Sequence, residues 1–162
     1  MKALTIRHPW PWAICCITES CNPKRIENRT WKPSPTQLPP GVKFAIHAGK
    51  MPSVIEIQEA FEGMAAMDAI DEYTNTPTMA ELRTMESAIV AVATFGGIVT
   101  ERDCKSRWFC GPYGWVLKDV IVLPEPVKCR GAQGLWNVPP DVLAKMRAQF
   151  NTCERAPTYG GT

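Results

Sequence analysis

A short segment, residues 24–31, gathers side chains that can hold a polar ligand. Its sequence, Lys-Arg-Ile-Glu-Asn-Arg-Thr-Trp, contains three cations, one carboxylate and one large aromatic ring. In an extended strand, alternate side chains point to opposite faces of the sheet. One face would then carry Arg25, Glu27, Arg29 and Trp31. Such a row favours a planar, polar and partly anionic ligand, such as a nucleotide.

The same segment also permits catalysis. A lysine near a glutamate is typical of acid–base sites when burial shifts the pKa of the two groups. Lys24 and Glu27 are such a pair, and His47 and Tyr113 are further candidate catalytic groups. The alternative for Lys24 and Glu27 is a surface ion pair, which contributes little to stability.

Aromatic rings and cations recur outside this segment. Bases of unstacked nucleic acid stack on aromatic rings while Lys and Arg hold the phosphates. Lys50 follows an apolar strand candidate and is a candidate phosphate ligand. The candidate stacking rings are Trp10, Trp12, Trp31, Tyr113 and Trp115. Each ring is also a credible core residue.

The cysteines and histidines predict no metal or cofactor. The chain has seven cysteines without C-x-x-C spacing and only two histidines, so a multi-histidine metal centre is not expected. We expect reduced thiols. A metal site formed by Cys21, Cys104 and Cys110 is the alternative to ordinary packing of these residues.

Charge is distributed unevenly over a chain of single-domain length. The 162 residues carry a net charge of +2, but residues 51–87 contain eight acidic residues and one base, whereas residues 1–50 contain eight bases and two acidic residues. The basic parts favour a polyanionic partner, and ordinary solubilising surface is the alternative. No long apolar run or secretory signal is evident, so we expect a cytoplasmic protein without membrane contact.

Hydrophobic patterning predicts short strands with helices around them. Strands are expected at residues 3–6, 24–31, 42–48, 88–99, 116–123 and 127–130. Helices are expected from Pro9 or Pro11, from Ser53 to about Asp71, from Thr76 to Met85, and from Pro139 to Phe150. Glycines 96 and 97 predict a bend of the kind that small barrels use at corners.

Because no regular βαβ alternation occurs, we predict an α+β fold, a small mixed-strand β-barrel with peripheral helices. Residues 1–150 would form one domain, with an acidic helical insertion at about 52–86. Residues 151–162 are expected to fray.

Several ordered segments together resemble one family. They are residues 2–7 with Pro9-Trp10, residues 24–31, residues 45–50, residues 88–94 and residues 108–115. This series is similar to the ASCH (activating signal cointegrator homology) family of the PUA-like group. The resemblance implies a small β-barrel with flanking helices, a cleft beside the Lys24-x-x-Glu27-x-Arg29 segment, and a role that involves RNA.

The resemblance also implies possible activities. Some ASCH relatives are amidohydrolases that act on 4-acetylcytidine and have a threonine three residues after the lysine. Here Glu27 stands in that position, so the proposed hydroxyl nucleophile is missing. Other relatives have been described as ribonucleases. His8 occupies a position where many relatives have glutamine.

The leading hypothesis is a module that binds RNA, or an exposed modified nucleotide or nucleoside. Lys24, Arg29 and Lys50 would contact phosphate or base edges, and Glu27 would accept a hydrogen bond from a base amino group. Stacking and rim contacts would come from Arg7, Trp10, Trp31, Tyr113 and Trp115. The alternative is a hydrolase in the same cleft. A third reading is an adaptor that binds a protein partner through the acidic helices.

The hypothesis places one condition on local structure. Lys24 can share a cleft with Glu27 and Arg29 only when it lies in the turn before the strand, where alternation does not apply. We therefore predict that the strand begins at or after Arg25.

Overall fold

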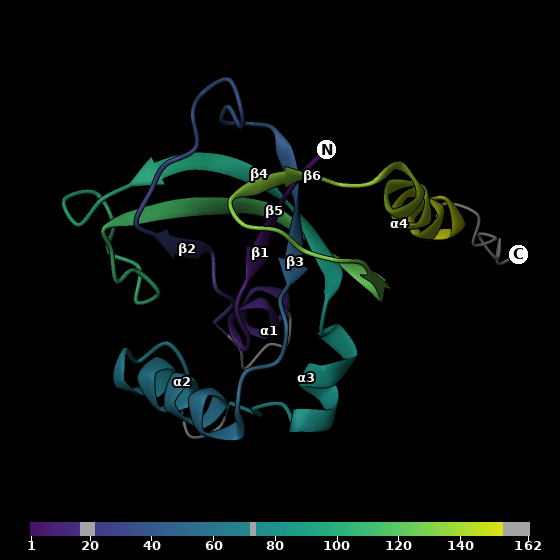
Figure 1. Cartoon of the computed structure of the whole chain (residues 1–162). Coiled ribbons are helices and arrows are strands. Elements are labelled where there is room, and N and C mark those ends of the chain that lie inside the picture. Colours follow the sequence, from purple (N-terminus) through teal and green to yellow (C-terminus); the bar gives the residue numbers. More distant parts are fainter. Residues whose placement is uncertain (17–21, 72–73, 154–162) are drawn as a thin grey trace, which may run out of the picture.

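The chain folds around one curled, mixed sheet (Figure 1). The computed structural model describes residues 1–16, 22–71 and 74–153. The strands are β1 (Lys2–Ile6), β2 (Ile26–Arg29), β3 (Lys43–Ala48), β4 (Ala88–Val99), β5 (Tyr113–Lys128) and β6 (Leu135–Asn137). The helices are α1 (Trp10–Cys15), α2 (Val54–Ala66), α3 (Met79–Met85) and α4 (Pro140–Cys153).

The order of strands in the sheet is β2-β5-β4-β3-β1-β6. Strands β1 and β3 are parallel and the other pairs are antiparallel. The sheet curls into a half-barrel, which confirms the predicted α+β class with mixed strands.

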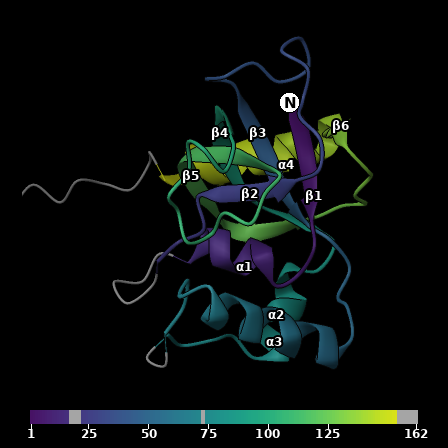
Figure 2. The same ribbon diagram turned by 90° about the vertical axis from the view of Figure 1, so that its left-hand side faces the viewer.

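Helices cover the sheet on two sides. Figures 1 and 2 show α1 against one side of the sheet with α2 and α3 beyond it. Helix α4 packs on the other face, where its Val142 and Met146 contact a cluster that includes Val92 and Leu123. Alternation along β1 and β3 divides the core: Leu4 and Phe44 belong to the cluster inside the curl, whereas Ala3 and Ala45 belong to the cluster that α4 covers.

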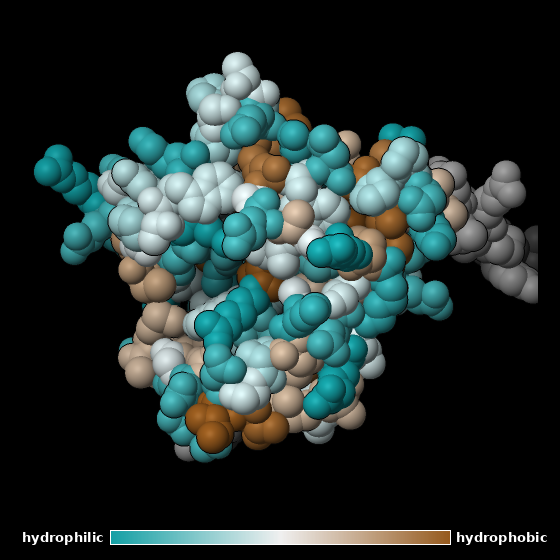
Figure 3. Space-filling view, viewed as in Figure 1, coloured by the Kyte–Doolittle hydropathy of each residue, from teal (hydrophilic) through white to brown (hydrophobic). Residues whose placement is uncertain are grey.

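The acidic segment between β3 and β4 is packed into the fold. Met64 of α2 is fully buried in a cluster that includes Ala13 of α1 and Trp108, and Leu82 of α3 is also fully buried. The first turn of α2 is open, since Val54 and Ile55 are 60% and 68% exposed, and the hydrophobic patch at the bottom of Figure 3 lies over this helix.

Strand β5 is longer than predicted because it continues through two prolines. Residues 116–123 and 127–130 were expected to form separate strands, but one strand reaches Lys128. Strand β2 pairs with Tyr113–Val116, and Leu117 donates to the Arg25 carbonyl just before β2, but no further strand of the described residues pairs with β5 on that side. Prolines are tolerated on such an edge and at bulges, and the register between β4 and β5 shifts beside Pro124 and Pro126.

The ends of other elements also differ from the prediction. Helix α2 ends at Ala66 rather than near Asp71, and α3 has Thr78 rather than Thr76 as its N-cap. The expected capping box at Ser53 and Glu56 is confirmed. Strand β6 was not predicted. Helix α4 extends to Cys153, three residues into the segment expected to fray, and residues 154–162 lie outside the described part.

The cysteines differ from the expectation in one respect. Cys16 is disulfide-bonded, whereas reduced thiols were expected. Cys15, Cys104, Cys110 and Cys129 are free. No helix within the described residues has the length and apolar character needed to cross a membrane.

Candidate functional site

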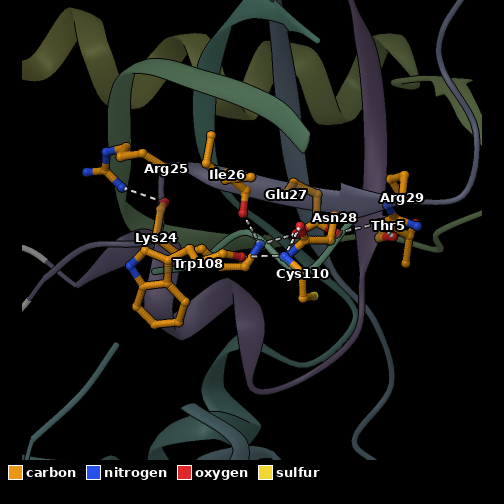
Figure 4. Close-up of polar contacts among 9 residues, drawn as sticks. All are labelled: Thr5, Lys24, Arg25, Ile26, Glu27, Asn28, Arg29, Trp108 and Cys110. Atoms are coloured by element: carbon orange, nitrogen blue, oxygen red, sulfur yellow. Dashed lines mark hydrogen bonds and ion pairs between the residues drawn. The ribbon is translucent and has the colours of Figure 1, made fainter. Parts of the chain in front are cut away.

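The lysine of the Lys-x-x-Glu-x-Arg segment lies just before β2 and points inward (Figure 4). Lys24 is 2% exposed, and its Nζ donates to the Ile26 carbonyl and, at 2.6 Å, to Oε2 of Glu27. The prediction that the strand begins at or after Arg25 is therefore confirmed, since β2 begins at Ile26.

Glu27 lies between two cations. Its Oε2 pairs with Lys24, and its Oε1 lies 3.1 Å from Nη2 of Arg29. The same Nη2 donates to the Thr5 carbonyl at 2.9 Å. Because Glu27 is 6% exposed, these are not the surface pairs that the alternative reading assumed. A buried charge that loses its partner costs about 3–5 kcal/mol, so the three groups must be held as a unit.

Neighbouring chain segments fix the position of β2. Asn28 donates from Nδ2 to the Trp108 carbonyl at 2.7 Å and accepts from the Cys110 amide at 3.0 Å. Gly114 is opposite Asn28 on β5, and a Cβ there would lie 2.7 Å from a methyl group of Ile26. A glycine at this position therefore allows the close approach of β2.

A small cavity adjoins this ion-paired group. It has a volume of about 180 Å³ and is lined by Trp10, Lys24, Glu27, Asn28, Met67 and Cys110. The Lys24 Nζ lies 5.9 Å from the centre of the Trp10 ring, within the range of a cation–π contact. The cavity thus combines one aromatic ring with an ammonium, a carboxylate and an amide.

A larger cavity begins at Arg29. It has a volume of about 920 Å³, and its lining includes Trp31, His47, Lys50 and Arg130. The other lining residues are Thr5, Arg29, Gly49, Ser87, Gly131, Ala132, Gln133 and Gly134. The predicted single cleft is therefore two cavities, and the Glu27–Arg29 ion pair links a residue of one to a residue of the other.

His47 is held at the wall of the larger cavity. It is 1% exposed, and its Nε2 donates to the Cys129 carbonyl at 3.0 Å. Its Nδ1 has no hydrogen-bond partner among the residues that the structure describes. Burial lowers the pKa of His47, and the bond to Cys129 opposes this shift. The imidazole is therefore neutral near pH 7 and carries its proton on Nε2.

Four predicted site residues line neither cavity. Arg7 is an exposed residue that pairs with Glu56 of α2. Trp115 is fully buried and packs on Phe44, Phe95 and Trp31, so its assignment as a stacking surface for a ligand was wrong. Tyr113 begins β5, with Nζ of Lys32 5.1 Å from its ring centre. Trp12 packs edge-on against Phe61.

Sequence reasoning missed Arg130 and the loop that follows it. Arg130 was expected only as the last residue of a strand at 127–130, and residues 131–134 had no role in the predicted site. An available signal was a cation directly before a glycine-bounded loop at the end of an apolar strand. This signal alone does not say which cavity the loop borders.

No group of three or more His, Cys, Asp or Glu side chains that could hold a metal ion occurs in residues 1–16, 22–71 and 74–153. Of the cysteines considered for a metal site, Cys21 lies outside these ranges. Neither a family model nor a curated protein matches the chain.

Proposed function

We propose that the chain is a cytoplasmic nucleic-acid-binding module of the PUA-like ASCH type that recognises RNA or an exposed nucleotide. The observation that carries the proposal is the Lys24–Glu27–Arg29 group, in which Lys24 and Glu27 are buried and Arg29 is partly buried, and whose members line both cavities. A base presents donors and acceptors at its edges and two apolar faces. An ammonium, a carboxylate and a half-buried tryptophan complement these features.

The roles of the residues follow from their positions. Glu27 accepts from a base amino group, and Lys24 donates to a ring or carbonyl acceptor of the base. Trp10 supplies the stacking surface in the small cavity, and Trp31 does so in the larger one. Lys24 contributes to base recognition rather than to phosphate binding, because its Nζ is buried against Glu27.

The test is binding of a single-stranded RNA oligonucleotide, measured at about 50 and 200 mM salt because phosphate contacts release counterions. We expect binding that weakens as salt rises. Affinity independent of salt would remove the phosphate contacts from the proposal, and absence of binding at both salt concentrations would contradict the proposal as a whole.

A hydrolase in the small cavity is the second candidate. The observation in its favour is the joint burial of Lys24 and Glu27 beside a space that admits a small group. In amide hydrolysis, water adds to the carbonyl carbon, the C–N bond breaks, and the leaving nitrogen takes up a proton. Lys24 and Glu27 are the groups in place to move these protons, whereas His47 lies at the other cavity.

Two assays test the hydrolase. Incubation with 4-acetylcytidine would release cytidine, and incubation with RNA, with and without a chelator, would release fragments. No turnover in either assay, together with retained RNA binding, would leave recognition as the function.

A further inference from the structure

The larger cavity has a charge pattern that the recognition of a base does not explain. Three cations line it, from β2, from the segment after β3 and from the segment after β5: Arg29, Lys50 and Arg130. No carboxylate is among the described residues that line it. Figure 3 shows hydrophilic residues among apolar ones across the middle of the face that Figure 1 presents.

The cations differ in how they are held. Lys50 and Arg130 are exposed, and within the described part of the chain neither side chain has an ion-pair or hydrogen-bond partner. Arg29 is fixed through Nη2 by Glu27 and by the Thr5 carbonyl. Its Nε is buried without a partner in the described residues, so the guanidinium retains a donor that is not satisfied.

The loop after β5 forms part of the wall of this cavity. The loop at residues 131–134 has small residues at all positions except Gln133, and Gly134 has a φ of 65°. Gly131 lies so close to His47 that an added Cβ would be 2.5 Å from its Cε1 atom. The loop therefore packs against His47 and forms part of the cavity wall.

We infer that this cavity binds a phosphoryl group, so that the ligand is a nucleotide rather than a free nucleoside. Arg29 supplies a fixed guanidinium, and Lys50 and Arg130 close on the phosphoryl oxygens when the ligand arrives. The base then lies on the Glu27 side of the Glu27–Arg29 ion pair. This inference rests on the proposed function for the base, but the phosphoryl contacts stand on the basic cavity alone.

The experiment compares ligands with and without phosphate. The full chain is titrated with cytidine 5′-monophosphate, cytidine, inorganic phosphate and a single-stranded RNA without terminal phosphates. We expect the monophosphate to bind more tightly than cytidine and inorganic phosphate to compete with it. Tight binding of the RNA, if Lys50→Ala and Arg130→Ala weaken it, would show that an internal diester also occupies the cavity.

Substitutions localise the effect. Lys50→Ala and Arg130→Ala should each weaken the binding of cytidine 5′-monophosphate and leave the affinity for cytidine unchanged. Each should also reduce the slope of log K against log salt for the RNA by about 0.7, the value for one lost phosphate contact on a single strand. Lys145→Ala on the exposed face of α4 is the matched control and should change neither quantity.

The outcomes separate this inference from the proposed function. RNA binding that is unaffected by Lys50→Ala and Arg130→Ala would overturn the phosphoryl site and leave RNA recognition standing. If the original chain binds phosphate but not RNA, and these variants abolish phosphate binding, the phosphoryl site would stand and RNA recognition would be overturned. Equal affinities for cytidine and its monophosphate would overturn the inference, as would absence of binding by all four ligands.

Discussion

At the scale of single residues, Glu27 is the carboxylate on which buried Lys24 and partly buried Arg29 depend. It neutralises Lys24 and fixes Arg29, and each contact needs its charge. Glu27→Gln keeps the shape of the side chain and removes that charge. We expect the free energy of unfolding to fall by about 3 kcal/mol, because Lys24 is left buried without a counter-charge.

Denaturant unfolding measures this change, with the exposed Glu101→Gln as the control, for which no comparable loss is expected. Combining Glu27→Gln with Lys24→Met should cost less than the sum of the two single changes, since each removes the same ion pair. Additive costs would show that the two side chains are not coupled.

The two histidines predict a dependence of stability on pH. Burial is the main cause that lowers the pKa of both His8 and His47 from the ordinary value of 6.5, although Glu86 opposes the shift at His8. The unfolded chain then binds more protons than the folded one as pH falls through 6.5 toward the lowered values. The contribution of the two neutral histidines to the free energy of unfolding is therefore fully present above pH 6.5 and is lost as the pH falls below it.

Thermal unfolding between about pH 5.5 and 7.5, the range in which histidine titrates, tests this expectation. Because the chain has only two histidines, the double variant His8→Gln/His47→Gln should show a flatter profile. Glutamine at position 47 retains an Nε2–H donor for the Cys129 carbonyl. A profile as steep as that of the original chain would assign the effect to other groups.

At the scale of elements, the loop after β5 depends on a glycine. A Cβ at Gly131 would lie 2.5 Å from His47 Cε1 and 2.6 Å from Thr5 Oγ1, distances that require the loop to move. We expect Gly131→Ala to displace the loop, lower stability and weaken nucleotide binding at the larger cavity. Calorimetry with cytidine 5′-monophosphate and thermal unfolding measure the two effects.

Gly63→Ala is the matched control for this change. Gly63 lies within α2, where an added Cβ meets no atom within 4 Å. Alanine should therefore stabilise the helix by up to about 1 kcal/mol, with no effect on binding. If Gly131→Ala behaved in the same way, the loop would not be held against His47.

The elements also show how far sequence patterns reach. Short-range chemistry predicted the Ser53–Glu56 capping box, because this box depends on a few consecutive residues. The position of Lys24 before β2 was predicted from the family resemblance, which implies one cleft for Lys24, Glu27 and Arg29, together with the alternation of side chains along a strand. Short-range chemistry did not predict that β5 continues through Pro124, since this depends on where β2 stops pairing. The contribution of Arg130 was missed for the same reason: its position relative to Arg29 is set by strand order.

At the scale of the whole molecule, the half-barrel is bridged by a side chain where the backbone does not pair. Strand β6 pairs with Lys2, Ala3 and Leu4 of β1, so the Thr5 carbonyl lies beyond its last pair. Arg29 of β2, from the other end of the strand order, donates to this carbonyl. One guanidinium thus joins the two edges of the sheet and also borders the larger cavity.

We expect Arg29→Met to weaken this contact between β2 and β1. The change leaves the Thr5 carbonyl and one oxygen of Glu27 without their donor, and such losses cost about 1–3 kcal/mol each. Hydrogen exchange should accelerate in β2 more than in β3 and β4, which are paired along their length. Arg25→Met is the matched control, because Arg25 also donates to backbone carbonyls but lies before β2 and does not bridge the edges. Equal acceleration of exchange in the two variants would mean that the sheet does not depend on the Arg29 bridge, and that Arg29 acts only at the cavity.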